Sequence, residues 1–167
     1  MRKRPVFSAA CLCLFLGLMF PAAVSANSSW HWISAQRPYD LLPLVAAVTL
    51  AAETFAVDHF GRVKRFPKTV WVIILANLLS FSAPYLLTYL ANAPIYTFAQ
   101  AVEHLPLFTV GFWYLLLTLG VEGPVVYFCL RRDVREQERL LAVIGLSNLV
   151  TTLFVALVER TLCHGSW

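Results

Sequence analysis

The sequence predicts an all-α, polytopic membrane protein whose four transmembrane helices form a parallel repeat of two helical hairpins, preceded by a signal peptide. The chain of 167 residues is 59% hydrophobic and only 13% charged, with a mean hydropathy of +0.70. That composition is too apolar for an ordinary soluble domain. Four apolar stretches are each long enough to cross a bilayer. Polar residues recur in register between the first two stretches and the last two.

Residues 1–26 have the three parts of a secretory signal peptide. A basic start, Met1 to Arg4, precedes an apolar run from Val6 to Phe20, and small residues before and at Ala26 form a cleavage site. We expect removal after Ala26 because the apolar run is short for a membrane span. Retention as a signal anchor is the alternative. Cleavage leaves residues 27–40 as an extracytoplasmic N-terminal segment.

The four apolar segments predict the spans of the mature chain. They run from Leu41 to Phe60, from Val70 to Leu90, from Pro106 to Leu130 and from Leu140 to Val158. Each exceeds the length that a helix needs to cross the hydrocarbon core. The resulting divisions are a first two-helix repeat at 41–90, an extracytoplasmic loop at 91–105, a second two-helix repeat at 106–160 and an extracytoplasmic tail at 161–167.

The distribution of Lys and Arg predicts the orientation. Two connections, 61–68 and 131–139, hold four basic residues each, whereas the connection at 91–105 holds none. Cytoplasmic loops are enriched in Lys and Arg, so both basic connections are predicted to be cytoplasmic. We therefore expect a multi-pass protein of the plasma (inner) membrane, with both mature termini outside the cytoplasm.

Short polar motifs recur between the two hairpins. Thr49–Glu53 and Thr118–Glu122 share the pattern Thr-Leu-x-x-Glu at an offset of 69 residues. Leu75–Ser80 and Leu146–Thr151 share Leu-small-Asn-Leu-apolar-hydroxyl at an offset of 71. Apolar segments resemble one another easily, but polar matches in register are harder to obtain by chance. An internal duplication is therefore predicted, and the even number of helices in each copy makes the repeat parallel.

Four polar residues lie within the apolar segments at one predicted depth: Glu53, Asn77, Glu122 and Asn148. Each is nine residues from a basic residue that bounds a cytoplasmic loop, respectively Arg62, Lys68, Arg131 and Arg139. Nine helical residues span about 13 Å, and half of a hydrocarbon core is about 15 Å. The four side chains are therefore expected near the middle of the bilayer, where an ionisable group usually has a function.

A hydroxyl lies one helical turn from each of these residues, namely Thr49, Ser80, Thr118 and Thr151. Exposing such polar faces to lipid is costly, so we expect all four faces to point into the bundle, with at least one Glu within hydrogen-bonding reach of an Asn. In one interpretation, two interhelical Glu/Asn pairs only hold the helices together, each contributing about 0.6 kcal/mol. That interpretation does not explain why Glu is used, since Gln makes the same bonds without ionising.

The functional interpretation uses what Gln lacks, a titratable proton or a negative charge. We expect a small transporter, or a transporter subunit, for a cation or a proton-coupled solute, with Glu53 and Glu122 as the ion or proton site. No cofactor is predicted, although two carboxylates with amide and hydroxyl oxygens also suit a divalent cation. The alternative is a non-catalytic scaffold or assembly subunit. An enzyme is not favoured, because two carboxyls alone do not define a reaction and no nucleophile motif or phosphate loop is present.

Net charge and size restrict the partners that the protein can have. Arg2, Lys3 and Arg4 supply three of the four net positive charges, so the rest of the chain has no basic patch for nucleic acid. Four helices enclose little volume, so a homo-oligomer or a larger membrane partner is expected in addition to the lipid bilayer.

Proline positions predict where the helices bend. Gly123 and Pro124 directly follow Glu122, and the proline removes the hydrogen bond to the Gly120 carbonyl. In the second helix, Pro84 removes a backbone hydrogen bond in the same way. Proline and glycine are also common in membrane helices at positions where they have no function. The first helix has Thr54 and Phe55 at the position equivalent to Gly123-Pro124, and no break is expected there.

Overall fold

The computed structural model describes residues 37–92, 95, 97, 100 and 110–162, and no strand occurs among them. Its helices are α2 (Arg37–Phe55), the π-helix η1 (Ala56–Phe60), α3 (Phe66–Asn92), α5 (Phe112–Leu130) and α6 (Gln137–Leu162). The all-helical class predicted from the sequence is confirmed for this part of the chain. The predicted signal peptide at 1–26, residues 27–36, most of the loop at 91–105 and residues 163–167 lie outside the described residues.

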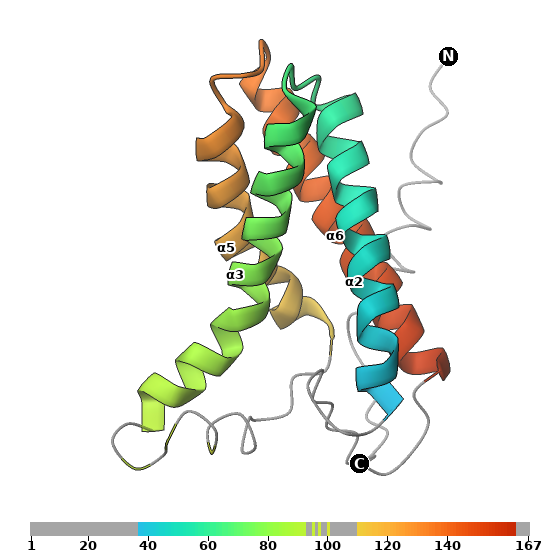
Figure 1. Ribbon diagram of the computed structural model, residues 1–167, viewed down its shortest axis with the longest axis vertical. Coiled ribbons are helices and arrows are strands. Elements are labelled where there is room, and N and C mark those ends of the chain that lie inside the picture. The colour runs from blue at the N-terminus through green and yellow to red at the C-terminus, as the bar shows by residue number, and fades with distance from the viewer. Residues whose placement is uncertain (1–36, 93–94, 96, 98–99, 101–109, 163–167) are drawn as a thin grey trace, which may run out of the picture.

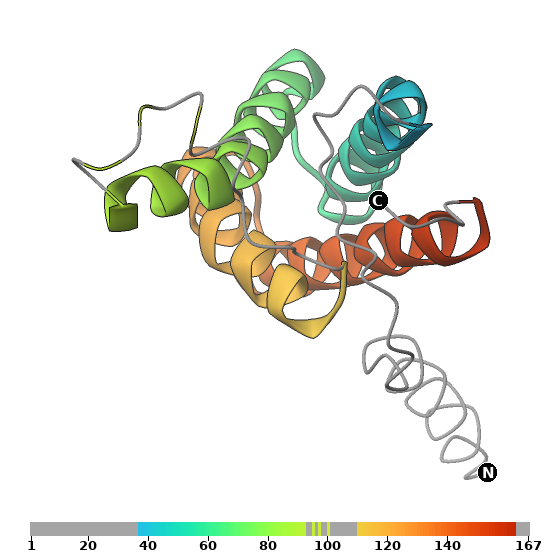
Figure 2. The ribbon, with the colours of Figure 1, turned by 90° about the horizontal axis from the view of Figure 1, so that it is seen from below.

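The helices form an up-and-down bundle in which each runs antiparallel to the one before it (Figure 1). Contacts join α3 to α5, α5 to α6, α6 to α2 and η1, and α2 to α3. The bundle is therefore a ring of four helices when viewed along its length (Figure 2). The two short basic connections, between η1 and α3 and between α5 and α6, lie together at one end.

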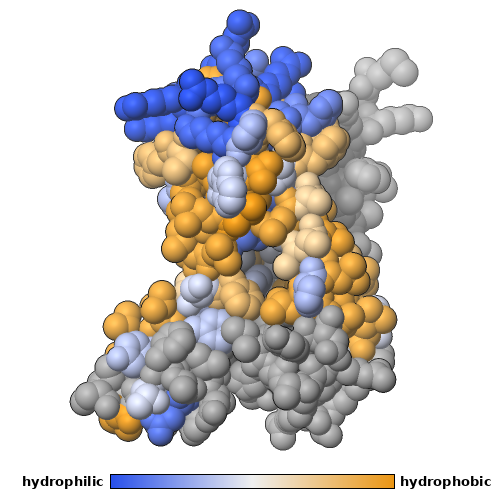
Figure 3. Space-filling model, viewed as in Figure 1, coloured by the Kyte–Doolittle hydropathy of each residue, from blue (hydrophilic) through white to orange (hydrophobic). Residues whose placement is uncertain are grey.

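The outer surface of the bundle is apolar. Leu44, Trp71, Leu90 and Leu146 are each at least 60% exposed, and Figure 3 shows a broad hydrophobic band below a hydrophilic cap at the loop end. Among the described residues, three segments are long and apolar enough to cross a membrane, Leu41–Phe60, Phe66–Ala91 and Gln137–Leu162. An apolar exterior of this extent matches lipid rather than water. The chain is therefore a helical membrane protein.

The third predicted span begins later than expected. Helix α5 starts at Phe112, and its apolar part, Tyr114–Leu130, is shorter than the other three segments. Gly111, with φ −170°, is extended rather than helical, and the backbone amide of Val110 bonds to a side chain of α6. A continuous helix from Pro106 is therefore wrong, although residues 106–109 themselves lie outside the described residues.

Basic side chains tie the helix ends together below the hydrophilic cap. Lys68 Nζ donates to the Cys129 carbonyl oxygen and to Asp133 Oδ2, both at 2.7 Å, and Arg139 Nε donates to the Phe60 carbonyl oxygen at 2.6 Å. The Lys68 hydrogen bond, assisted by its charge, lowers the pKa of Asp133. These bonds use the final carbonyls of α5 and η1, which have no partner in their own helices.

An apolar core fills the bundle next to the loops. It is formed mainly by Val57, Val72, Ile73, Val126, Leu130, Leu140 and Ile144, all of them buried. In each helix these residues lie between the basic connection and the polar residue singled out in the sequence. The core therefore separates the loop end of the bundle from its polar interior.

The first helix stays continuous through Thr54 and Phe55, as expected, but its hydrogen-bond geometry changes near its end. It changes from α to π geometry at Ala56, and the amide of Gly61 donates to the Ala56 carbonyl at 3.3 Å, the i to i+5 spacing of a π-helix. A Cβ added at Gly61 would lie 2.3 Å from the Val57 carbonyl oxygen, so glycine permits this tight exit. No proline marks the site, and the widened turn packs against α6, a tertiary effect that local sequence does not express.

The proline positions have different effects. Helix α5 continues through Pro124 as one helix of 19 residues. Helix α3 contains Pro84 and changes direction in its second half (Figure 1). Loss of a backbone hydrogen bond at Pro84 accounts for this bend.

Candidate functional site

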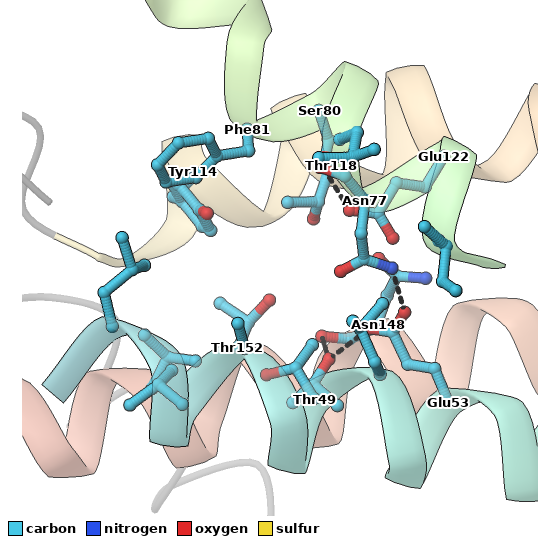
Figure 4. Close-up of a pocket in the computed structure, with 18 residues that line it drawn as sticks. Thr49, Glu53, Asn77, Ser80, Phe81, Tyr114, Thr118, Glu122, Asn148 and Thr152 are labelled. Atoms are coloured by element: carbon cyan, nitrogen blue, oxygen red, sulfur yellow. Dashed lines mark hydrogen bonds between the residues drawn. The ribbon is translucent and has the colours of Figure 1, made fainter. Parts of the chain in front are cut away.

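The four helices present their polar residues to one interior. Glu53 of α2, Glu122 of α5 and Asn148 of α6 are 2%, 3% and 4% exposed, and Asn77 of α3 is half-buried. All eight residues singled out in the sequence line one cavity: Thr49, Glu53, Asn77, Ser80, Thr118, Glu122, Asn148 and Thr151. The predicted convergence is therefore confirmed as geometry (Figure 4).

Glu53 joins three helices. Its Oε2 accepts a hydrogen bond from Asn77 Nδ2 at 2.7 Å, and its Oε1 accepts one from Thr151 Oγ1 at 2.8 Å. The expectation that a Glu lies within reach of an Asn is confirmed by the first bond. Because the donors come from α3 and α6, the carboxyl of α2 links both of its neighbours in the ring.

Glu122 has a different partner from the one expected. It accepts a hydrogen bond from the Ser80 hydroxyl of α3, whereas Asn148 Nδ2 donates to the Ile144 carbonyl of its own helix at 3.1 Å. The interpretation in which two Glu/Asn pairs hold the helices together therefore applies to the first pair only. Equal depth does not determine rotation about the helix axis or side-chain rotamer, and a carboxamide can bond back to its own helix as easily as across the bundle.

The two carboxyls occupy corresponding positions in the hydrogen-bond pattern. Ser80 and Thr151 are equivalent in the repeat, and each hydroxyl bonds to the carboxyl of the other hairpin, Ser80 to Glu122 and Thr151 to Glu53. Each hydroxyl also lies near the carbonyl three residues back, at 3.1 Å from Asn77 O and 3.2 Å from Asn148 O. The bonds between hairpins are therefore matched in type and position.

The cavity has a volume of about 290 Å³. It extends from the carboxyls away from the basic loops, and the apolar core closes it on the loop side. Its walls are mostly apolar, with the polar groups gathered at the inner end and Phe81 and Tyr114 at the other (Figure 4). A mostly apolar pocket with a few convergent polar groups is the usual form of a small-ligand site.

Ten lining residues were not singled out in the sequence, and three of them carry a hydroxyl or an aromatic ring: Phe81, Tyr114 and Thr152. Helical spacing could have found them. Tyr114 is four residues before Thr118, Phe81 is four after Asn77, and Thr152 is four after Asn148, so each lies one turn along an already identified polar face.

A further buried carboxyl, Glu159, also escaped notice. Its Oε2 accepts a hydrogen bond from the Val110 amide at 3.0 Å, and Arg160 Nη2 donates to the Val110 carbonyl at 3.4 Å. Glu159 does not line the cavity. It fixes the chain just before α5 against α6, and the only sequence signal was its position beside Arg160 at the end of an apolar segment.

A metal site receives no support from the acidic residues alone. Among the residues that the structure describes, no group of three or more His, Cys, Asp or Glu side chains is placed to hold a metal ion. A metal ion between Glu53 and Glu122 would need its remaining oxygen ligands from amide and hydroxyl groups.

No protein-family model, curated protein sequence or solved structure matches this chain. Its function must therefore be argued from the cavity itself.

Proposed function

We propose that the protein is a small membrane transporter, or a subunit of one, for a cation or a proton-coupled solute. The observation that carries this proposal is the convergence of two buried carboxyls, Glu53 and Glu122, from different helices on one cavity within apolar spans. Ionisable groups at such depth are costly to insert and usually mark an ion or proton pathway. Asn77, Asn148 and the neighbouring hydroxyls act as supporting ligands.

The hydroxyl contacts support proton exchange. A hydroxyl has one hydrogen, and that of Ser80 faces two acceptors, a Glu122 oxygen and the Asn77 carbonyl oxygen. When Glu122 is ionised, Ser80 donates to it. When Glu122 is protonated, the carboxyl donates to Ser80, and Ser80 turns to the carbonyl. Thr151 has a similar choice between Glu53 and the carbonyl oxygens of Ser147 and Asn148, so each carboxyl can change protonation state without moving its helix.

We also infer that the bundle arose by duplication of a helical hairpin. Matched contacts between the hairpins support this inference beyond the sequence motifs. Lys68 donates to the Cys129 carbonyl, and its equivalent Arg139 donates to Phe60, which is equivalent to Cys129. Ser80–Glu122 and Thr151–Glu53 form the second matched pair. A duplication would relate both pairs by a pseudo-two-fold axis along the membrane normal.

The cavity is closed toward the basic loops, which we assign to the cytoplasm by the positive-inside rule. Transport therefore requires the apolar core to open. Movement of one hairpin against the other is the change that a parallel repeat allows. A homo-oligomer or a larger membrane partner would brace the moving hairpin.

A scaffold role is the second candidate, and one observation favours it. Both carboxyls accept hydrogen bonds from other helices, so they also hold the bundle together. Transport and scaffold differ in whether ionisation matters. Gln preserves the hydrogen bonding and removes titration.

The deciding experiment compares Glu53→Gln and Glu122→Gln with the unaltered protein in proteoliposomes. We expect both variants to fold and both to lose proton-coupled flux, measured with an entrapped pH dye while gradients of Na⁺, Mg²⁺ or an alkylammonium ion are imposed. Glu159→Gln is the matched control, because Glu159 is buried but lies outside the cavity. Flux that survives in both cavity variants would contradict a role of these carboxyls in transport. Absence of flux in the unaltered protein, with both variants folding normally, would leave the scaffold role.

A further inference from the structure

The charge of the cavity restricts its ligand. Two carboxyls line it, and the described residues that line it include no Lys, Arg or His. In surroundings of low dielectric constant, an ionised carboxyl needs a positive partner close by. A cationic ligand supplies that charge, whereas an anion would meet repulsion at the inner end.

The polarity of the cavity changes along its length. Glu53 and Glu122 lie at the end nearest the loops, and Phe81 lies at the other end (Figure 4). Leu42 and Val155 also line the cavity and are farther along α2 and α6 from the basic loops than the polar residues. A ligand that fills both parts has a charged head and an apolar body. A bare metal ion would leave the apolar part empty.

The volume restricts the size of the ligand. A cavity of about 290 Å³ lies at the lower end of the range of small-ligand pockets, which is roughly 300–1,000 Å³. This space suits a compact small molecule. It is too small for a helix of a partner protein, whose diameter is about 10 Å.

The route into the cavity lies between two helices. Figure 3 shows the apolar surface hollowed between α3 and α2, with polar atoms at the base of the hollow. Ala46 and Leu50 of α2 and Leu78 of α3 line the cavity on this side and are partly or fully exposed. Asn77 is also half-buried rather than buried. At this depth the hollow faces hydrocarbon, so a molecule that partitions into the bilayer can reach the carboxyls.

We infer that the cavity binds a small amphipathic organic cation, an ammonium group on a compact apolar body, which enters from the bilayer between α2 and α3. The inference rests on the proposed transport function for its biological use. The ammonium group lies between Glu53 and Glu122, and the apolar body extends toward Phe81.

The test measures binding to the full-length protein in nanodiscs of neutral lipid by isothermal titration calorimetry and by the shift in Tm. The probes are n-hexylammonium, n-hexanol and hexanoate. We expect saturable binding of n-hexylammonium that is at least about tenfold tighter than that of n-hexanol, and no binding of hexanoate. Glu53→Gln combined with Glu122→Gln should remove this preference, since both carboxyls then carry no charge.

A second pair of variants tests the position of the ligand. Ala46→Phe fills the cavity and should lower the affinity for n-hexylammonium by at least about tenfold. Ala47→Phe places the same ring on the adjacent, exposed position outside the cavity and should leave the affinity unchanged. The Tm of each variant without ligand reports whether it folds. If only Ala46→Phe fails to fold, Phe81→Ala, which shortens the apolar wall, is expected to weaken n-hexylammonium binding instead.

Equal binding of n-hexylammonium and n-hexanol, or unchanged binding in the Gln variant, would overturn the inference, because both results indicate simple partition into lipid. Binding of Na⁺ or Mg²⁺ without binding of n-hexylammonium would also overturn it. Proton-coupled flux without amine binding leaves the proposed transport function standing and removes only this ligand. Amine binding without any flux would support this ligand and contradict the proposed transport function.

Discussion

At the scale of single residues, the polar interior depends on a few hydrogen bonds with matched roles. Glu53 accepts from two helices, and Glu122 accepts from Ser80. A buried carboxyl that loses such a donor keeps its desolvation cost without compensation, which typically amounts to about 1–3 kcal/mol. Each hydroxyl can therefore donate a hydrogen bond to its carboxyl in the ionised form and accept one from it in the neutral form.

Ser80→Ala tests this double role. We expect the variant to lower the free energy of unfolding by about 1–3 kcal/mol and to slow proton-coupled flux, because Glu122 then lacks its hydroxyl partner. Ser80→Thr is the matched control, since the equivalent position in the second hairpin is Thr151. It should retain flux. The measurements are unfolding in mixed detergent micelles and flux in proteoliposomes, and equal behaviour of the Ala and Thr variants would contradict the role of the hydroxyl.

At the scale of helices, the sequence could predict depth but not every contact. Constant rise per residue places Glu53 and Glu122 at one level from the basic ends, and the hydroxyl one turn away indicates which face is inward. The partner of Glu122 could not be predicted, because rotamers and small helix rotations decide between Asn148 and Ser80. The π-helix was equally hidden, since it depends on packing of the helix end against α6.

Gly61→Ala tests how η1 ends. The added methyl group would lie 2.3 Å from the Val57 carbonyl oxygen, so the backbone must shift, and we expect the free energy of unfolding to fall by about 1–3 kcal/mol. Gly145→Ala is the matched control, because nothing lies within 4 Å of a Cβ added there. In a helix interior that change should stabilise by up to about 1 kcal/mol. A similar change in the free energy of unfolding at both sites would show that the end of η1 has room for a Cβ at Gly61.

At the scale of the whole molecule, two features of the bundle depend on each other. The contacts Lys68–Cys129 and Arg139–Phe60 hold both basic loops at one end. The same end is closed by the apolar core, so the cavity lies on the far side of that core. The ring of four helices and its polar interior were foreseen from hydropathy and spacing. The closed end was not, because apolar residues look alike in sequence whether they face the bundle or lipid.

Labelling from each side of the membrane tests this arrangement. In a chain with every native cysteine replaced by serine, Lys64→Cys and Arg135→Cys are exposed positions in the two basic loops, and Leu162→Cys is an exposed position at the opposite end of α6. A membrane-impermeant maleimide should label the two loop positions only in inside-out vesicles and Leu162→Cys only in right-side-out vesicles. Labelling of the two loop positions from opposite sides would contradict the bundle itself. Labelling of both only from the extracytoplasmic side would preserve the bundle and reverse the side on which the apolar core closes the cavity.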